Sequence, residues 1–204
     1  MSEDKEIKII LLGETGVGKT NLIRVATGED FNPNSSSTVT NTYSEGSTII
    51  NEKTYKYNLW DTAGQEKYRS MNKLFVKDSK IIFIVFSITL RKTFEQIDYW
   101  YKYIKDALGE GKYIVALIGN KSDLYEEEEV LNNEVKNKAN ELNIKFKITS
   151  AKTDAKGFIQ FLNEILKEYI NKYLSEGGEG HNAFKIDSKK NKDNKDNKDG
   201  KKCC

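Results

Sequence analysis

A glycine-rich octapeptide near the start of the chain has the residue types and the spacing of a phosphate-binding loop. Residues 13–20 read Gly-Glu-Thr-Gly-Val-Gly-Lys-Thr, which matches the pattern G-x-x-x-x-G-K-T. Glycines allow successive backbone N–H groups to point inward around phosphate oxygens. Lys19 would bring positive charge to the β- and γ-phosphates, and the Thr20 hydroxyl would be a ligand for Mg²⁺. The loop therefore predicts a bound nucleotide of unspecified base, with its phosphates surrounded by Glu14, Thr15, Gly16, Val17, Gly18, Lys19 and Thr20.

A second pattern suited to phosphate follows a strand-like stretch further along the chain. Asp61-Thr62-Ala63-Gly64 has the spacing D-x-x-G, and Gln65 comes next. An aspartate at a strand end can hold Mg²⁺, here through a water molecule, while the N–H of Gly64 can reach a γ-phosphate oxygen. Gln65 can orient a water for in-line attack on that phosphate. A lone D-x-x-G is common by chance, but behind a phosphate loop it indicates a site for nucleotide hydrolysis.

A third pattern indicates the base. Asn120-Lys121-Ser122-Asp123 reads N-K-x-D at another strand end. The Asp123 carboxylate can accept hydrogen bonds from N1–H and the 2-amino group of guanine, whereas adenine would leave it desolvated and unpaired. The Asn120 amide can tie the base loop to the phosphate loop, and the stem of Lys121 can cover the base plane. Guanine is therefore predicted, with contacts from Asn120, Lys121, Asp123, Ser150, Ala151 and Lys152, the N–H of Ala151 reaching guanine O6.

Strand and helix patterns place these motifs at one edge of a sheet. Apolar runs predict buried strands, and a short connection at Asn51-Glu52 predicts a hairpin. Each motif follows a strand end, where ligands bind in such sheets. We therefore expect an α/β, three-layer α/β/α fold with a six-stranded, mostly parallel sheet and one antiparallel hairpin strand. The expected strands are 7–12, 43–50, 53–60, 81–86, 113–118 and 145–149, and the expected helices are 19–26, 93–108, 135–142 and 158–173.

Other segments have a predicted role of their own. Residues 28–42 lack periodicity and are long enough to form a functional loop. A polar helical segment is expected after Glu66, to about Phe75. In the helix that starts at Thr93, apolar positions step by three and four and predict a core stripe. That stripe consists of Phe94, Ile97, Tyr101, Ile104 and Leu108.

The composition excludes several classes of protein. A length of 204 residues with 37% hydrophobic and 31% charged residues suits one soluble globular domain. The chain shows no apolar run of transmembrane length and no signal-peptide core, and its 2 cysteines fit the reducing cytosol. Residues 185–204 contain eight Lys and four Asp, so the rest of the chain has 25 basic and 27 acidic side chains. A nucleic-acid-binding body would be strongly basic.

Together these motifs resemble those of the Ras-superfamily small GTPases, over residues 7 to about 174. The stretch 60–66, Trp-Asp-Thr-Ala-Gly-Gln-Glu, is most similar to the Rab branch. The resemblance implies the P-loop GTPase fold and a switch between GTP and GDP. Thr38 would coordinate Mg²⁺ and contact the γ-phosphate only in the GTP form, Gly64 would contact that phosphate from a second switch, and Phe31 would lie edge-on beside the guanine. Loss of the γ-phosphate would release both switch loops.

The resemblance also implies an enzyme that hydrolyses GTP to GDP and phosphate. Hydrolysis would be slow, because the chain shows no strong general base and no obvious arginine finger, and an activating protein would accelerate it by about three to five orders of magnitude. Thr15 stands where many relatives have Gly or Ser and crowds the γ-phosphate side, so the intrinsic rate stays open. The catalytic residues would be Gln65, Thr38 and Lys19, and the Mg²⁺ ligands Thr20, Thr38 and Asp61.

Two segments depart from the Rab pattern. Residues 40–43 read Thr-Asn-Thr-Tyr where Rab proteins usually have Gly-Val-Asp-Phe, and residues 75–79 read Phe-Val-Lys-Asp-Ser where they usually have Tyr-Tyr-Arg-Gly-Ala. Both lie on or beside switch surfaces that partners contact, so effector identity does not transfer. A Rho-like or Ras-like signalling role and a GTP-binding scaffold with negligible hydrolysis stay open. A small-molecule kinase or ATPase is disfavoured by the guanine motif and by Gln65.

Residues 177–204 predict a disordered tail behind a small GTPase domain of residues 1–176. The tail is rich in Lys, Asn and Asp and would not fold alone. Cys203-Cys204 lacks the C-a-a-X farnesylation pattern and resembles the double geranylgeranylation signal of Rab proteins. Two lipid chains would anchor the protein stably, and Lys201-Lys202 would add attraction to anionic lipid. The expected location is the cytoplasmic face of an intracellular membrane of the vesicle, endosome or Golgi type, in exchange with the cytosol.

The implied partners follow from the same resemblance. Besides guanine nucleotide they are effectors, an exchange factor, a GTPase-activating protein and a Rab escort or GDI-type prenyl chaperone. The GTPase domain is expected to be monomeric, and no nucleic-acid partner is expected. The organelle, the transport step and the individual partners are not specified by this sequence.

Overall fold

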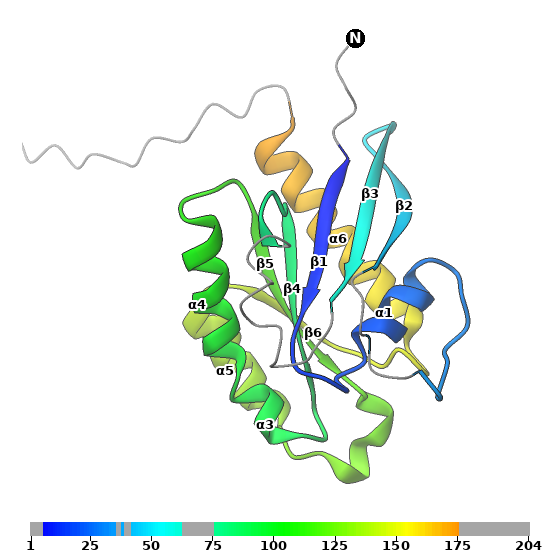
Figure 1. Ribbon diagram of the computed structural model, residues 1–204, viewed down its shortest axis with the longest axis vertical. Helices are drawn as coiled ribbons and strands as arrows, with labels where there is room; N and C mark the ends of the chain where they lie inside the picture. Colours follow the sequence, from blue (N-terminus) through cyan, green and yellow to red (C-terminus); the bar gives the residue numbers. More distant parts are fainter. Residues whose placement is uncertain (1–5, 36–37, 39–41, 63–75, 176–204) are drawn as a thin grey trace, which may run out of the picture.

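Strands alternate with helices in the computed structural model, which describes residues 6–35, 38, 42–62 and 76–175 (Figure 1). The strands form a six-stranded sheet in the order β2-β3-β1-β4-β5-β6. β2 runs antiparallel to β3, and the other neighbouring strands are parallel. The predicted fold class is confirmed. In chain order the elements are β1 (Ile7–Leu12), α1 (Lys19–Ala26), β2 (Thr42–Ile50), β3 (Lys53–Asp61), β4 (Ile81–Ser87), α3 (Arg91–Phe94), α4 (Ile97–Leu108), β5 (Ile114–Asn120), the 3₁₀ helix η2 (Ser122–Glu127), α5 (Asn132–Leu142), β6 (Lys145–Ile148) and α6 (Ala155–Tyr173).

The central strands bury both of their faces. Successive side chains of a strand point to opposite sides of the sheet. Leu11 of β1 and Phe83 of β4 therefore pack in a cluster with α1 and α6. Their neighbours Leu12 and Ile84 pack in a second cluster with α4 and α5. Helices thus cover both sides of the sheet and give the three layers seen in Figure 1.

The hairpin between β2 and β3 has the predicted two-residue connection. Asn51 and Glu52 both have positive φ, 50° and 63°. Two consecutive residues of positive φ are what a type I′ turn requires, and its twist matches the twist of the strands that it joins. The turn fixes the antiparallel register from Ile50 opposite Lys53 to Thr42 opposite Asp61. The end of β3 thereby brings Asp61 back beside β1.

The single helix predicted from Thr93 is wrong, because two elements replace it. α3 begins at Arg91 and contains Thr93, whose hydroxyl donates to Leu90 O at 2.7 Å and accepts from the N–H of Ser87 at 3.0 Å. These bonds hold α3 as a separate turn beside the end of β4, and α4 starts at Ile97.

The predicted core stripe of this region is only partly correct. Ile97 and Ile104 are fully buried as expected. Trp100 and Tyr103 are also buried, whereas Tyr101 is only partly buried. Four aromatic side chains lie close together in this helix, so the sequence period alone does not say which of them turn toward the sheet. Packing on the sheet decides it.

Two motif residues belong to strands rather than to loops. β3 extends to Asp61 and β5 to Asn120, so each of these side chains comes from the last residue of a hydrogen-bonded strand. β1 pairs with β3 up to Leu11 opposite Asp61, which fixes the position of the carboxylate relative to the phosphate loop. Among the residues that the structure describes, no helix has the length and hydropathy to cross a membrane.

The core around Phe83 should dominate the stability of the domain. Its ring is fully buried, with centroids 6.2 Å from Phe158 and 6.0 Å from Phe161 of α6. Phe83→Ala should lower the free energy of unfolding by about 3–5 kcal/mol, measured by urea denaturation. The control Ile49→Ala changes a side chain that is 75% exposed. This variant should change the free energy of unfolding by no more than about 0.5 kcal/mol. Equal losses for both variants would contradict this core.

Candidate functional site

A cavity of about 600 Å³ opens where the loops behind β1, β5 and β6 meet. In Figure 1 these loops lie below the sheet, beyond the carboxyl ends of the parallel strands. This volume suits a small molecule or a cofactor. The phosphate loop, the N-K-x-D motif and residues 150–152, distant in sequence, therefore share one cavity, and Thr62 of the D-x-x-G motif also lines it, whereas Asp61 does not. The predicted site residues that line it are Thr15, Gly16, Gly18, Lys19, Thr20, Phe31, Thr38, Asn120, Lys121, Asp123, Ser150, Ala151 and Lys152.

The phosphate loop needs glycine at positions where its backbone closely approaches other elements. Gly13 has φ 149°, and a Cβ there would lie 2.1 Å from Val85 O of β4. Gly18 has φ 95°, and a Cβ there would lie 2.3 Å from Nδ2 of Asn120. Neither approach leaves room for a side chain, and positive φ disfavours one as well. The two glycines therefore let the loop pack against β4 and against the base motif.

Two predicted loop residues, Glu14 and Val17, are not among the residues that line the cavity. Val17 is fully buried in the core on the α1 side of the sheet. The backbone carbonyls of both residues are used inside the site, because Glu14 O accepts from Lys19 and Val17 O accepts from Asn120. Their role in the described structure is to hold the loop.

Lys19 is a buried cation at the wall of the cavity. Its side chain is 5% exposed, and Nζ donates to Gly13 O and Glu14 O, both at 2.9 Å. Desolvation lowers the pKa of Lys19 to about 8, against the opposing charges of Asp61 and Glu14. An ammonium has three donors. Two are bonded to loop carbonyls, which leaves one for an anionic ligand.

Three oxygen-bearing side chains from three segments converge beside Lys19. The hydroxyls of Thr20 and Thr38 are 2.8 Å apart, and Thr38 Oγ1 donates to Asp61 Oδ2 at 3.2 Å. Asp61 is 4% exposed, and burial raises its pKa although hydrogen bonds from Thr20 and Thr38 and the charge of Lys19 oppose the rise. Its other oxygen, Oδ1, is buried without a hydrogen-bond partner among the described residues.

This oxygen cluster fits a magnesium ion. Mg²⁺ prefers hard oxygen ligands and usually takes only one or two protein carboxylates, with ligand phosphates and water completing its shell. A buried carboxylate with an unpartnered oxygen gains most from a cation. In the described part of the chain no three His, Cys, Asp or Glu residues gather into a metal site. The oxygen atoms that converge here come from two threonine hydroxyls and one carboxylate.

Asn120 joins the phosphate and base ends of the cavity. It is 2% exposed, and Nδ2 donates to Val17 O at 2.8 Å while Oδ1 accepts from the N–H of Ala151 at 3.1 Å. The predicted link between the base loop and the phosphate loop is confirmed. The same Ala151 N–H was assigned to guanine O6, and this assignment stays a prediction that requires the donor to be shared.

The carboxylate of Asp123 is held in place by Ser150, in the loop behind β6. Its Oδ1 accepts from the hydroxyl of Ser150 at 2.6 Å, and that hydroxyl oxygen accepts from the backbone N–H groups of Lys152 and Thr153 at 3.0 and 3.1 Å. A carboxylate accepts at both oxygens, so Oδ2 is available for a base edge. Lys121 precedes it with φ 70°, in the left-handed region, where the chain turns into η2. The bond to Ser150 was not predicted.

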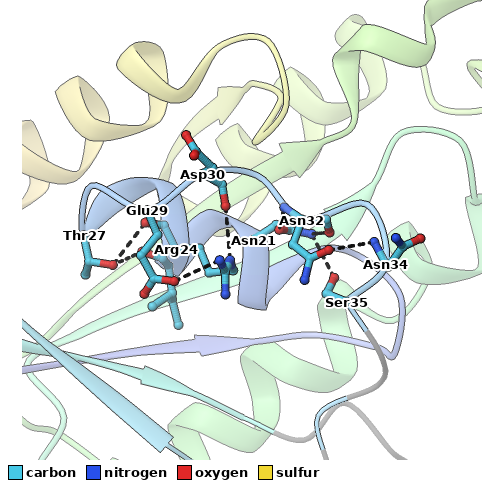
Figure 2. A network of polar contacts seen from close by, with 9 residues as sticks. Asn21, Arg24, Thr27, Glu29, Asp30, Asn32, Asn34 and Ser35 are labelled. Carbon is cyan, nitrogen blue, oxygen red and sulfur yellow. Dashed lines mark hydrogen bonds and ion pairs between the residues drawn. The ribbon is translucent and has the colours of Figure 1, made fainter.

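Some cavity residues were missed by the sequence analysis, namely Asn21, Pro33, Ser35, Thr62 and Leu124. Thr62 donates to Leu11 O at 2.6 Å and so connects the end of β3 to β1. Asn21 contacts the loop behind α1, where it bonds Asn32 and Ser35 (Figure 2). An asparagine one residue behind a phosphate-loop threonine has no sequence signature of its own, and only the loop that folds back onto it shows its role.

The two segments that depart from the Rab pattern differ in exposure where they are described. Tyr43 is 52% exposed and stacks on Trp60 at 5.0 Å, with the ammonium of Lys8 4.9 Å from the Trp60 ring. Tyr43 is thus available to a partner. Val76 and Ser79 are buried, so these two positions contribute to packing beside the surface rather than to the surface itself.

Several predictions fall outside the described residues. They concern Gly64 and Gln65, the helical segment to Phe75, Thr40 and Asn41, and the tail with Cys203 and Cys204. The water-orienting role of Gln65 and the contact of Gly64 with the γ-phosphate therefore stay predictions. The boundary between a domain of residues 1–176 and a tail of residues 177–204 stays one as well.

Comparison with known proteins agrees with the geometry of the cavity. The family model described as "Ras family" matches residues 8–171. The chain is 33% identical to the Ras-related protein rab-11.1 of Caenorhabditis elegans over 181 residues, 87% of this chain and 85% of that protein. It is 32% identical to the human Ras-related protein Rab-22A over 179 residues, 86% of this chain and 91% of that protein. It is also 32% identical to the GTP-binding protein ypt3 of Schizosaccharomyces pombe over 180 residues, 87% of this chain and 84% of that protein. The chain belongs to the Ras family, as a Rab-like small GTPase that hydrolyses GTP to GDP and acts in vesicle traffic.

Proposed function

We propose that Thr38 reports which nucleotide occupies the cavity and thereby sets the state of the switch. The observation that supports this proposal is the contact of one loop hydroxyl with two motif residues. Thr38 lies between α1 and β2, and its Oγ1 is 2.8 Å from Thr20 Oγ1 and 3.2 Å from Asp61 Oδ2. A γ-phosphate and its cation in the same place would hold this loop residue, and their loss would release it.

Thr20, Thr38 and Asp61 are the residues that would hold Mg²⁺. When bound, the ion neutralises charge on the β- and γ-phosphate oxygens. Lys19 supplies a fixed positive charge to the same phosphates from a desolvated position, where its interaction is stronger than it would be in water. Lys19 and the loop amides therefore position the phosphates before any partner binds.

Hydrolysis would rest on Gln65, which orients the attacking water. No arginine is among the described residues that line the cavity, so we expect a GTPase-activating protein to supply the missing positive charge. An exchange factor would open the cavity, and effectors would read the exposed switch surface that includes Tyr43. A prenyl chaperone of the escort or GDI type would carry the lipidated form through the cytosol.

The choice of guanine should depend on Asp123. Asp123→Asn replaces an acceptor by an amide, so guanine N1–H and the 2-amino group lose their partner while xanthine gains one. The affinity for GDP should fall by about 10²-fold or more and the affinity for xanthosine diphosphate should rise, measured by titration calorimetry. The control is Asp98→Asn. Asp98 lies on α4 and pairs with Lys138, so this change should leave both affinities unchanged. Unaltered GDP affinity in Asp123→Asn would overturn the assignment.

The magnesium site should depend on Thr20. EDTA should accelerate GDP release from the wild-type protein, because Mg²⁺ held by Thr20 and Asp61 would no longer neutralise the phosphate charge. Thr20→Ala should raise the Mg²⁺ concentration that restores slow release by about 10–100-fold. Thr27→Ala is the control, since among the described residues the Thr27 hydroxyl bonds two carbonyls of α1, Ile23 O and Arg24 O, just before it. The same Mg²⁺ dependence in Thr20→Ala as in wild type would remove Thr20 from the ligand set.

Lipid attachment at Cys203 and Cys204 is a further part of this proposal. It is supported by membership of the Rab branch and by the lysines at 201 and 202 beside the two thiols. Changing both cysteines to serine should move the protein from the membrane to the soluble fraction of fractionated cells. Changing both lysines to glutamine should only weaken binding to anionic vesicles. Membrane association that survives the loss of both cysteines would contradict lipid anchoring.

A further inference from the structure

Helix α1 holds the loop that follows it with two side chains on one of its faces. Asn21 and Arg24 are three residues apart and are therefore neighbours on the helix surface. Arg24 Nε donates to Asp30 O at 3.2 Å, and its guanidinium pairs with Glu29 at 3.0 Å. Asn21 contacts the loop one turn closer to the phosphate loop, as Figure 2 shows. The loop is therefore fixed on α1 at two successive points.

The Asn21 carboxamide makes three hydrogen bonds and is 7% exposed. Nδ2 donates to Asn32 O at 3.0 Å and to Ser35 Oγ at 2.9 Å, and Oδ1 accepts from the N–H of Asn32 at 2.9 Å. The side chain thus satisfies both backbone polar groups of Asn32, as a neighbouring strand would. A carboxamide nitrogen has two hydrogens, and both are used. Asn21 therefore has no donor left for a ligand, although it lines the cavity.

The segment that Asn21 holds has a fixed local shape. Asn32 Oδ1 accepts from the N–H of Asn34 at 2.9 Å, and the N–H of Ser35 donates to Asn32 O at 3.3 Å. Pro33 restricts φ inside this turn. Side-chain bonds from asparagine to a backbone N–H two residues later are typical of such turns. Residues 32–35 therefore form a preshaped unit that docks on one amide.

Phe31 lies between the two anchor points, Asp30 and Asn32. It is partly buried, packs against the core cluster on the α1 side of the sheet and lines the cavity. None of the bonds that hold its neighbours involves Thr20, Thr38 or Asp61, the oxygens assigned to Mg²⁺. The contacts that place Phe31 are therefore separate from the contacts that respond to the γ-phosphate.

We infer that Asn21 is a positioning residue that holds residues 30–35 on α1, keeps Phe31 beside the base in both nucleotide states and so sets the rate of nucleotide release. This inference rests on the proposed function, because it takes the cavity as the guanine nucleotide site. It follows that two parts of the loop between α1 and β2 have different roles. The part up to Ser35 stays on α1, and the response to the γ-phosphate belongs to Thr38.

Nucleotide release from the full chain tests this inference. The protein is loaded with fluorescent GDP or with a fluorescent non-hydrolysable GTP analogue, and release is followed after excess unlabelled nucleotide is added. Asn21→Ala should accelerate the release of both nucleotides by a similar factor, about tenfold, because three partly buried hydrogen bonds are lost. Thr27→Ala removes a hydroxyl that bonds two carbonyls at the end of α1 and should release both at the wild-type rate. Acceleration for only one nucleotide would overturn the inference.

Three further variants distinguish positioning from general destabilisation. Ser35→Ala removes one of the three bonds at an exposed position and should accelerate release in the same direction by a smaller factor. Phe31→Ala should accelerate release as well, and the double variant Asn21→Ala/Phe31→Ala should be no faster than the faster single variant, since Asn21 acts through Phe31. Additive effects in the double variant would overturn the inference, because contacts that act independently add.

The outcomes separate this inference from the proposed function. If the wild-type chain did not retain guanine nucleotide, the proposed function would fail. If the wild type retained it and Asn21→Ala released both nucleotides at the wild-type rate, only the role of Asn21 would fail. Thermal unfolding of each nucleotide-loaded variant accompanies the kinetics. A loss of stability in Asn21→Ala without faster release would also count against positioning.

Discussion

One buried carboxamide fixes the geometry on which the rest of the site depends. Asn120, the last residue of β5, bonds Val17 O in the phosphate loop and the N–H of Ala151 in the loop behind β6. It reaches the phosphate loop only because Gly18 has no Cβ, which would lie 2.3 Å from Nδ2. A nucleotide spans a fixed distance between phosphate and base. The two ends of the cavity are therefore set by the protein before the ligand arrives, which lowers the ordering cost of binding.

The phosphate end of the cavity concentrates buried charge. Burial lowers the pKa of Lys19 to about 8 and raises the pKa of Asp61. For each group the cost of desolvating its charge therefore exceeds the stabilisation that neighbouring charges and hydrogen bonds provide. A polyphosphate and a cation would supply the missing partners. Since both would bind the folded chain and not the unfolded chain, nucleotide binding and folding stability are coupled. Thr38 joins this cluster through one hydroxyl, which makes its position sensitive to the ligand.

Helix α1 serves both ends of the loop that follows it. Thr20 contacts the oxygen cluster, whereas Asn21 and Arg24 contact the backbone behind the helix (Figure 2). Adjacent residues on a helix point in different directions, so neighbouring positions can have unrelated partners. In our proposal, Asn21 therefore helps to hold the nucleotide, and Thr20 contacts Thr38, the residue that responds to the γ-phosphate. Tyr43 on β2 is exposed and stacks on Trp60 of β3, which is itself partly buried.

The fold class, the strands and the three motifs could be predicted from the amino-acid sequence, because apolar runs, the Asn51-Glu52 turn and glycine spacing are local patterns with direct physical causes. The sequence pattern could not show which aromatic side chains of α4 are buried, since docking of the helix on the sheet turns Trp100 inward and leaves Tyr101 partly exposed. The bond from Ala151 to Asn120 and the contact of Asn21 with the loop behind α1 could not be predicted either. These contacts join residues distant along the chain, and the partner of a buried amide depends on which backbone groups the fold brings beside it.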